Sequence, residues 1–174
     1  MTGTWPEEVV VDDVDALVLR APDPIDAEAL TAAVNSSLDH LGAFLDWAKE
    51  PTTVDAQAVR LAIAAEAFAV GGDAAYSIFR GDDLVGALGL HWRLGPDALE
   101  IGYWLRADHE GIGIITRSVH AALDVAFDVE GVRRVVIHCR PDNARSAAVP
   151  RRLGFVRTAT QPRQRWEYHR PAAP

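Results

Sequence analysis

The stretch "HEGIGIIT" (109–116) alternates glycine with isoleucine before it continues into a helical pattern. An ordinary turn combines one glycine with polar residues, whereas this stretch holds two glycines beside stiff β-branched side chains. Gly111 and Gly113 have no Cβ, so their backbone can approach a neighbouring group more closely than that of any other residue. The stretch therefore predicts a loop that brings backbone N–H groups close to a ligand at the start of a helix.

The composition indicates a soluble globular protein and excludes several other classes. The 174 residues are 49% apolar and 24% charged, which is ordinary for a domain with its own core. A net charge of -8 argues against binding nucleic acid through its phosphates. No apolar run reaches the roughly 18 residues that a membrane span requires, so no membrane contact is expected.

Cysteine usage and the chain ends indicate the compartment and the extent of the domain. Cys139 is the single cysteine, so an internal disulfide cannot form, and the expected location is the reducing cytoplasm. The first residues lack the basic and apolar segments of a signal peptide. We expect one domain over residues 1–174, with a core at about 16–169 and flexible termini at 1–10 and 171–174.

Hydrophobic periodicity divides the chain into strand and helix patterns. One strand is followed by helices, then by antiparallel strands, then by two helical crossovers. This order predicts the α/β class, as an α+β mixed sheet flanked by helices. Gly42 is expected to divide the first helical region. We expect strands at 16–22, 74–80, 84–94, 98–105, 133–139, 155–160 and 163–170, and helices at 26–48, 53–70, 113–129 and 142–154.

The strand at 98–105, the glycine loop and the helix that follows together predict a phosphate site. Unpaired N–H groups and the positive end of the helix dipole meet at such a helix start. Two glycines by themselves fit a simple strand-to-helix turn as well as a phosphate-binding loop. The flanking sequence has to distinguish these two possibilities.

Three flanking blocks occur in the order of a known family. They read "EIGYWL" (100–105), "EGIGIIT" (110–116) and "HCRPDNARSAAVPRRLGF" (138–155). Together they resemble the signature blocks of the GCN5-related N-acetyltransferases (GNAT), and more narrowly the RimJ/RimL type, which acetylates protein N-termini. The resemblance covers roughly residues 16–160. It implies a twisted, mostly antiparallel sheet with splayed central strands, and direct acetyl transfer from acetyl-coenzyme A (acetyl-CoA) to an amine in a ternary complex.

The resemblance also implies which residues bind the coenzyme. The backbone of Tyr103, Trp104 and Leu105 would bind the acetyl-pantetheine arm, and the Asn143 amide would contact the pantetheine. Glu110 replaces the usual glutamine or arginine, and a carboxylate near a pyrophosphate is repulsive unless it points away. The residues that would cradle the pyrophosphate are Glu110, Gly111, Ile112, Gly113, Ile114, Ile115 and Thr116.

Transfer to an amine requires a proton donor for the departing thiolate and an acceptor for the amine proton. Ser146, one helical turn after Asn143, matches the family's serine general acid, whereas Pro150 stands where many relatives have a tyrosine. Glu100 is the expected carboxylate base, acting through water. His138 and His91 remain alternatives, and each histidine fits an ordinary structural role as well.

Other readings of the chain stay open. Cys139 is interpreted as a packing residue, because no nucleophilic triad surrounds it and no metal-ligand spacing is present. The acceptor is a protein N-terminus or a small cationic amine, such as an aminoglycoside or an aminoacyl nucleotide. A non-catalytic acyl-CoA-binding or regulatory module on the same fold is the alternative from another class. We further expect a homodimer and an acidic acceptor groove formed by Asp39, Asp46, Glu50 and Asp55.

Overall fold

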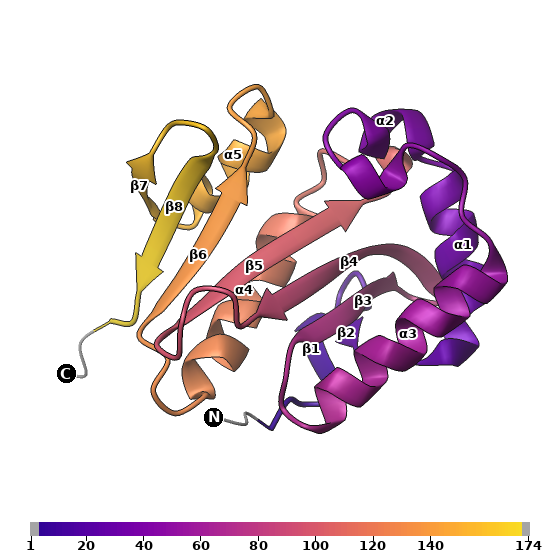
Figure 1. Cartoon of the computed structure of the whole chain (residues 1–174), viewed down its shortest axis with the longest axis horizontal. Coiled ribbons are helices and arrows are strands. Elements are labelled where there is room, and N and C mark those ends of the chain that lie inside the picture. The colour runs from indigo at the N-terminus through magenta and orange to yellow at the C-terminus, as the bar shows by residue number, and fades with distance from the viewer. Residues whose placement is uncertain (1–3, 172–174) are drawn as a thin grey trace.

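A computed structural model describes residues 4–171 and contains one eight-stranded sheet (Figure 1). The strand order is β1-β2-β3-β4-β5-β6-β8-β7, and only β5 and β6 are parallel neighbours among the described strands. The predicted mixed, mostly antiparallel sheet is therefore confirmed. The strands are β1 (Glu8–Asp12), β2 (Leu17–Arg20), β3 (Ala74–Arg80), β4 (Asp83–His91), β5 (Ala98–Leu105), β6 (Arg134–Cys139), β7 (Val156–Ala159) and β8 (Gln164–His169).

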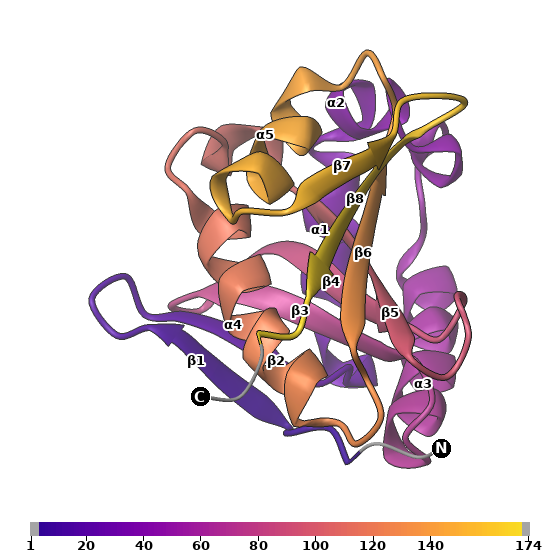
Figure 2. The same ribbon diagram turned by 90° about the vertical axis from the view of Figure 1, so that its left-hand side faces the viewer.

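Helices cover both faces of the sheet, as Figures 1 and 2 show. Helices α1 and α3 pack together over β3 and β4 on one face, here called the α3 face. Helix α4 crosses the opposite face, here called the α4 face, and links the parallel strands β5 and β6. No helix in residues 4–171 has the length and apolar character needed to cross a membrane. The helices are α1 (Ala27–Asn35), α2 (Leu38–Gly42), α3 (Val54–Ala69), α4 (Ile114–Asp128) and α5 (Ala144–Arg152), with 3-10 turns η1 (Pro24–Asp26), η2 (Asp46–Ala48) and η3 (Ala107–His109).

The first helical region is interrupted earlier than the sequence predicts. Helix α1 ends at Asn35, whose side chain binds the backbone N and O of Thr52, both at 2.9 Å. This pairing turns the chain away from the helix axis before the predicted break at Gly42. Gly42 ends α2 instead, where an added Cβ would lie 2.9 Å from the carbonyl oxygen of Ala48.

The described part of the N-terminal segment packs against the sheet, although the sequence predicts that residues 1–10 are flexible. Trp5 is 4% exposed, and its indole N–H donates to the carbonyl oxygen of Gly72 at 2.9 Å. The Tyr76 hydroxyl donates to the carbonyl oxygen of Pro6 at 2.9 Å, and β1 then adds a strand to the sheet. Residues 1–3 and 172–174 lie outside the described residues.

The two parallel strands separate halfway along their length. Strand β5 pairs with β6 only from Ala98 to Ile101, although β5 itself continues to Leu105 along β4. Strand β6 continues along β8 to Cys139. Figure 1 shows β5 and β6 diverging from a common start. The predicted splay of the central strands is confirmed, and it begins at Gly102.

Candidate active site at the splayed strands

A cleft of about 1800 Å³ opens where β5 and β6 separate. It is lined by the ends of both strands, the glycine loop, α5, and on the other side α2 and η2. Small-molecule sites usually occupy roughly 300–1,000 Å³, so this cleft has room for an extended ligand together with a second molecule.

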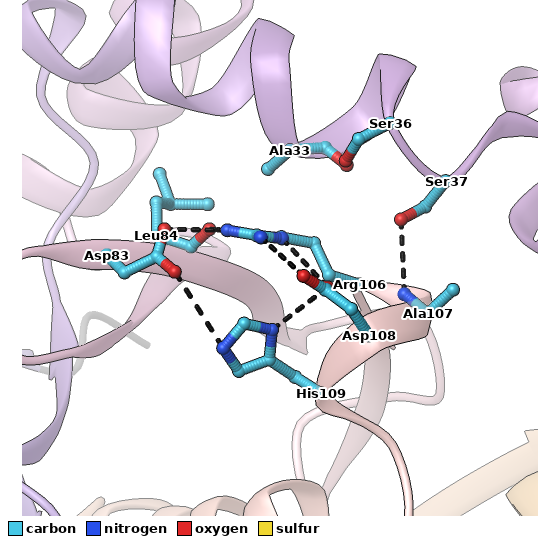
Figure 3. Close-up of polar contacts among 9 residues, drawn as sticks. All are labelled: Ala33, Ser36, Ser37, Asp83, Leu84, Arg106, Ala107, Asp108 and His109. Atoms are coloured by element: carbon cyan, nitrogen blue, oxygen red, sulfur yellow. Dashed lines mark hydrogen bonds and ion pairs between the residues drawn. The ribbon is translucent and has the colours of Figure 1, made fainter.

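The chain between β5 and the glycine loop is anchored at both sides (Figure 3). Arg106 donates to Asp83 at 2.6 Å and, through two nitrogens, to Asp108 at 2.7 and 3.1 Å. The hydrogen bond from Arg106 lowers the pKa of Asp108 to about 2, so this pair stays ionised at neutral pH. The amide of Ala107 donates to Ser37 Oγ at 3.1 Å, which ties η3 to the start of α2. These contacts fix the point from which the loop departs.

Both glycines of the loop adopt backbone angles that favour glycine. Gly111 has φ = 81° and Gly113 has φ = 82°, and Gly113 is the N-cap of α4. No side chain caps this helix start, so its first N–H groups stay available to a ligand. A Cβ on either glycine would meet no protein atom within 4 Å. Crowding by the rest of the protein therefore does not explain why these two positions lack a side chain. The predicted anion site therefore has the required geometry.

The large residues of the loop contribute mainly backbone. Ile114 and Ile115 are buried in the core, so their side chains anchor the helix start. Ile112 is 51% exposed between the two glycines. Thr116 and Arg117 also line the cleft.

Glu110 is paired rather than free to repel an anion. Its carboxylate forms an ion pair with Arg145 of α5 and lies 3.1 Å from His40 Nε2 of α2. The loop is thereby tied to helices on both sides of the cleft. The two cationic or hydrogen-bonding partners offset the repulsion that the sequence alone suggests.

Ser146 lies in the first turn of α5, and Tyr103 reaches it from β5. The Tyr103 hydroxyl donates to the carbonyl oxygen of Ser146 at 3.0 Å and lies 3.3 Å from Ser146 Oγ. Asn143 caps the helix, since its Oδ1 accepts from the Ser146 amide at 3.0 Å. The predicted Asn-x-x-Ser unit is thus assembled as a helix cap with its serine in the cleft.

The position of the Tyr103 side chain beside Ser146 is not predicted from the sequence. From the sequence, this residue is expected to act only through its backbone, and Pro150 occupies the usual tyrosine position of α5. In the structure a phenol still stands beside the serine, but it comes from β5. Burial raises the pKa of Tyr103 far above its ordinary value, so the phenol stays protonated and remains a donor.

Strand register places the candidate bases on the α3 face. His91 of β4 lies opposite Glu100 of β5, and Glu100 Oε1 lies 3.5 Å from His138 Nδ1 of β6. All three side chains line the cleft. Cys139 points to the other face and is 4% exposed in the core, in agreement with its interpretation as a packing residue.

Aromatic side chains form another wall of the cleft. Trp104 packs edge-on against Trp47 of η2, with ring centroids 6.1 Å apart, and Arg60 lies 5.4 Å from the Trp47 ring. Leu105, at the end of β5, is partly buried against the core. Among the described residues, no group of three or more His, Cys, Asp and Glu side chains could hold a metal ion.

Three of the four carboxylates that were expected to form an acidic groove do not line the cleft. Of Asp39, Asp46, Glu50 and Asp55, only Asp46 lines the cleft, and it pairs with Lys49 at 2.6 Å. Within residues 4–171 the lining holds seven arginines against four carboxylates. The cleft is thus locally basic in an acidic protein. The arginines are Arg60, Arg93, Arg117, Arg140, Arg145, Arg152 and Arg163, and the carboxylates are Asp46, Glu100, Glu110 and Asp142.

The chain matches the sequence profile of a known protein family. The sequence profile of the acetyltransferase (GNAT) domain family matches residues 16–156. The chain belongs to this family. The putative ribosomal N-acetyltransferase YdaF of Bacillus subtilis (strain 168) is 31% identical over 144 residues, which cover 80% of this chain and 78% of that protein.

Two further GNAT relatives belong to the RimJ/RimL branch. The ribosomal-protein-serine acetyltransferase of Escherichia coli (strain K12) is 39% identical over 83 residues, 47% of this chain and 46% of that protein, so the match spans about half of that relative's length. The solved structure of RimL, a ribosomal L7/L12 alpha-N-protein acetyltransferase in complex with coenzyme A, superposes with a TM-score of 0.81 at 28% identity. That match covers 88% of this chain and 93% of RimL. The predicted GNAT family and RimJ/RimL branch are confirmed.

We predict that Gly113→Ala lowers the affinity for acetyl-CoA at least tenfold. An L-residue at φ = 82° costs about 1–2 kcal/mol, and its Cβ would stand where the phosphate must approach the backbone. Gly81→Ala is the matched control, because Gly81 has φ = 58° and equally open surroundings in the β3–β4 turn. Calorimetry on both folded variants makes the comparison. Equal affinity in the two variants would contradict the phosphate loop.

Proposed function

We propose that this protein transfers the acetyl group of acetyl-CoA to the N-terminal α-amine of a protein. The observation that carries the proposal is the splay of β5 and β6 beside an uncapped start of α4, in a chain of the GNAT family. The relatives named for ribosomal-protein acetylation support a protein N-terminus as the acceptor.

The two substrates would enter from opposite faces of the sheet. Acetyl-CoA supplies the activated acetyl group, and the loop at 110–116 with the start of α4 would hold its pyrophosphate. The unpaired edge of β5 at Tyr103–Leu105 would bind the arm that carries the thioester. The acceptor amine would then approach from the α3 face, where Glu100 and His138 lie.

The reaction joins the amine nitrogen to the carbonyl carbon and breaks the carbon–sulfur bond. Sulfur leaves with the bonding electron pair and takes a proton from Ser146 Oγ, which Tyr103 orients and which then regains a proton from solvent. Glu100 attracts the ammonium form of the acceptor into the cleft through its negative charge. Ser146 and Glu100 are therefore the proposed catalytic residues.

The acceptor pocket favours an acidic protein N-terminus. Arg60, Arg93 and Arg163 line the cleft, and a protein chain advances at most about 3.3–3.6 Å per residue. Carboxylates within the first few residues of the acceptor would thus lie within reach of these guanidinium groups. Electrostatic attraction of this kind raises capture rates and weakens with salt.

We predict that peptides with Asp or Glu at positions two to four are acetylated with kcat/KM about tenfold above matched Lys peptides at low salt. Mass spectrometry on free and N-terminally blocked peptides measures the product. Arg60→Ala should reduce the preference, whereas Arg133→Ala, which removes an exposed charge outside the cleft, should not. A preference for Lys peptides would contradict this assignment of the acceptor.

The same assay distinguishes the alternative functions. A protein that acetylates aminoglycosides or aminoacyl nucleotides but no peptide would be a small-amine acetyltransferase. A protein that binds acetyl-CoA tightly and releases no thiol with any amine would be a binding module. Either result overturns the proposed N-terminal acetylation.

We predict that Ser146→Ala lowers kcat by about ten- to a hundredfold with little change in acetyl-CoA affinity. A thiolate is a tolerable leaving group, so the loss of its proton donor slows the reaction without stopping it. Ser36→Ala, at the exposed end of α1, is the control. Single-turnover rates measure the chemical step, and an unchanged rate would return Ser146 to a purely structural role.

We also propose a homodimer that acts in the cytoplasm. The resemblance to the RimJ/RimL type implies a dimer, and the buried free thiol of Cys139 suits a reducing compartment. Helix α3 exposes Val59 and Ile63, and its C-cap Val70 is exposed as well, so a partner copy could cover these apolar side chains. Light scattering is expected to give the mass of two chains, and Ile63→Glu should shift it toward one. A monomer at all concentrations contradicts the dimer.

A further inference from the structure

His91 at the end of β4 is held in one orientation by Asp73. Its Nδ1 lies 2.8 Å from Asp73 Oδ2, and the other carboxylate oxygen, Oδ1, accepts from the Trp92 amide at 2.9 Å. The side chain of His91 is 19% exposed and lines the cleft. An imidazole fixed at one nitrogen by a fixed carboxylate is the arrangement of an oriented base.

The chemistry of Asp73 determines which nitrogen of His91 carries the proton. Burial raises the pKa of Asp73, but the hydrogen bonds from the Trp92 amide and from His91 together lower it below its ordinary value. An ionised carboxylate only accepts hydrogen bonds, so Nδ1 must be the donor. In the neutral ring, Nε2 then carries the free lone pair.

Two glycines make room for this ring beside the splay. Gly89 lies opposite Gly102 in the β4–β5 ladder, and a Cβ on Gly89 would overlap the imidazole of His91. A Cβ on Gly102 would lie 3.8 Å from His91 Nε2. His91 Nε2 therefore lies above Gly89 and beside Gly102, which is the residue where β5 separates from β6.

Charged groups from each neighbouring element surround the ring. Asp73 comes from the turn after α3, Arg93 follows β4, Glu100 lies opposite on β5, and His138 stands on β6 beside Glu100. Asp73 and Glu100 bring negative charge to this part of the cleft, whereas Arg93 brings positive charge. An amine that docks over Gly102 would lie among these groups.

We propose that His91 Nε2 is the group that removes the proton from the acceptor amine, with Asp73 as its positioning residue. This inference rests on the proposed acetyl transfer and assigns its proton acceptor. The ammonium proton passes to Nε2, and the nitrogen lone pair released in this way bonds to the thioester carbonyl carbon. The carbon–sulfur bond then breaks, the second nitrogen proton goes to solvent, and His91 returns its proton to solvent.

The kinetic test compares kcat and its pH dependence in five variants with an acidic peptide as acceptor. His91→Gln should lower kcat about a hundredfold or more. It should also remove the acidic limb of the pH–rate profile, which is the fall of kcat at low pH that protonation of an imidazole base produces. Asp73→Asn should cause a smaller loss of kcat, because the imidazole loses the carboxylate that fixes its orientation. His120→Gln, on the exposed side of α4, should match the parent protein.

Gly89→Ala tests the geometry without changing any titratable group. Its Cβ would displace the His91 ring, so kcat should fall as it does in His91→Gln. Calorimetry must show unchanged acetyl-CoA affinity in each variant, which separates a catalytic loss from misfolding. A retained acidic limb in His91→Gln, together with its loss in Glu100→Gln, would overturn the proposal and make Glu100 the direct base.

A spectroscopic arm tests the site without any turnover. Nitrogen-15 spectra of histidine-labelled protein, assigned with His91→Gln, are expected to show the Nδ1–H tautomer of His91 at neutral pH. The Nε2–H tautomer would overturn the proposal even in an active enzyme. If no peptide is acetylated while the Nδ1–H tautomer is present, the proposed function fails and the orientation of His91 still stands.

Discussion

The early end of pairing between β5 and β6 is the constraint on which the site depends. After the last β5–β6 pair, β5 stays hydrogen-bonded to β4 and β6 stays hydrogen-bonded to β8. The separation therefore opens a cleft without detaching either strand from the sheet. The backbone edge of β5 is left unpaired at Gly102–Leu105, and an unpaired edge inside a cleft needs a hydrogen-bonding partner. The site chemistry is arranged around this edge.

In the proposed reaction, the two substrates occupy opposite faces of the sheet. Alternation along β5 sends Tyr103 to the α4 face, toward Ser146, and sends Glu100 and Gly102 to the α3 face, toward His91. The donor side therefore holds an uncapped helix start and neutral hydroxyl groups. The acceptor side holds titratable groups, and the gap between the strands connects the two sides.

The charge of the cleft is opposite in sign to the net charge of the chain. The chain has 25 acidic and 17 basic residues, yet arginines outnumber carboxylates in the cleft. Net charge reports the whole surface and does not predict the charge of a site, which is why Asp39, Glu50 and Asp55 were wrong as groove residues. The Glu110 carboxylate shows the same limit, since the fold supplies Arg145 and His40 from helices that are distant in sequence.

The sequence by itself determined the loop at 110–116, the strands around it and the Asn143–Ser146 unit, because each depends on neighbours within a few residues. Glycines at positive φ, helix caps and alternating strands are local features, and the three family blocks are contiguous. Only the tertiary structure decided which groups face each other across the cleft. The Tyr103 phenol beside Ser146 and the Asp73 carboxylate on His91 depend on strand register and on the α3–β3 turn, which local periodicity does not encode.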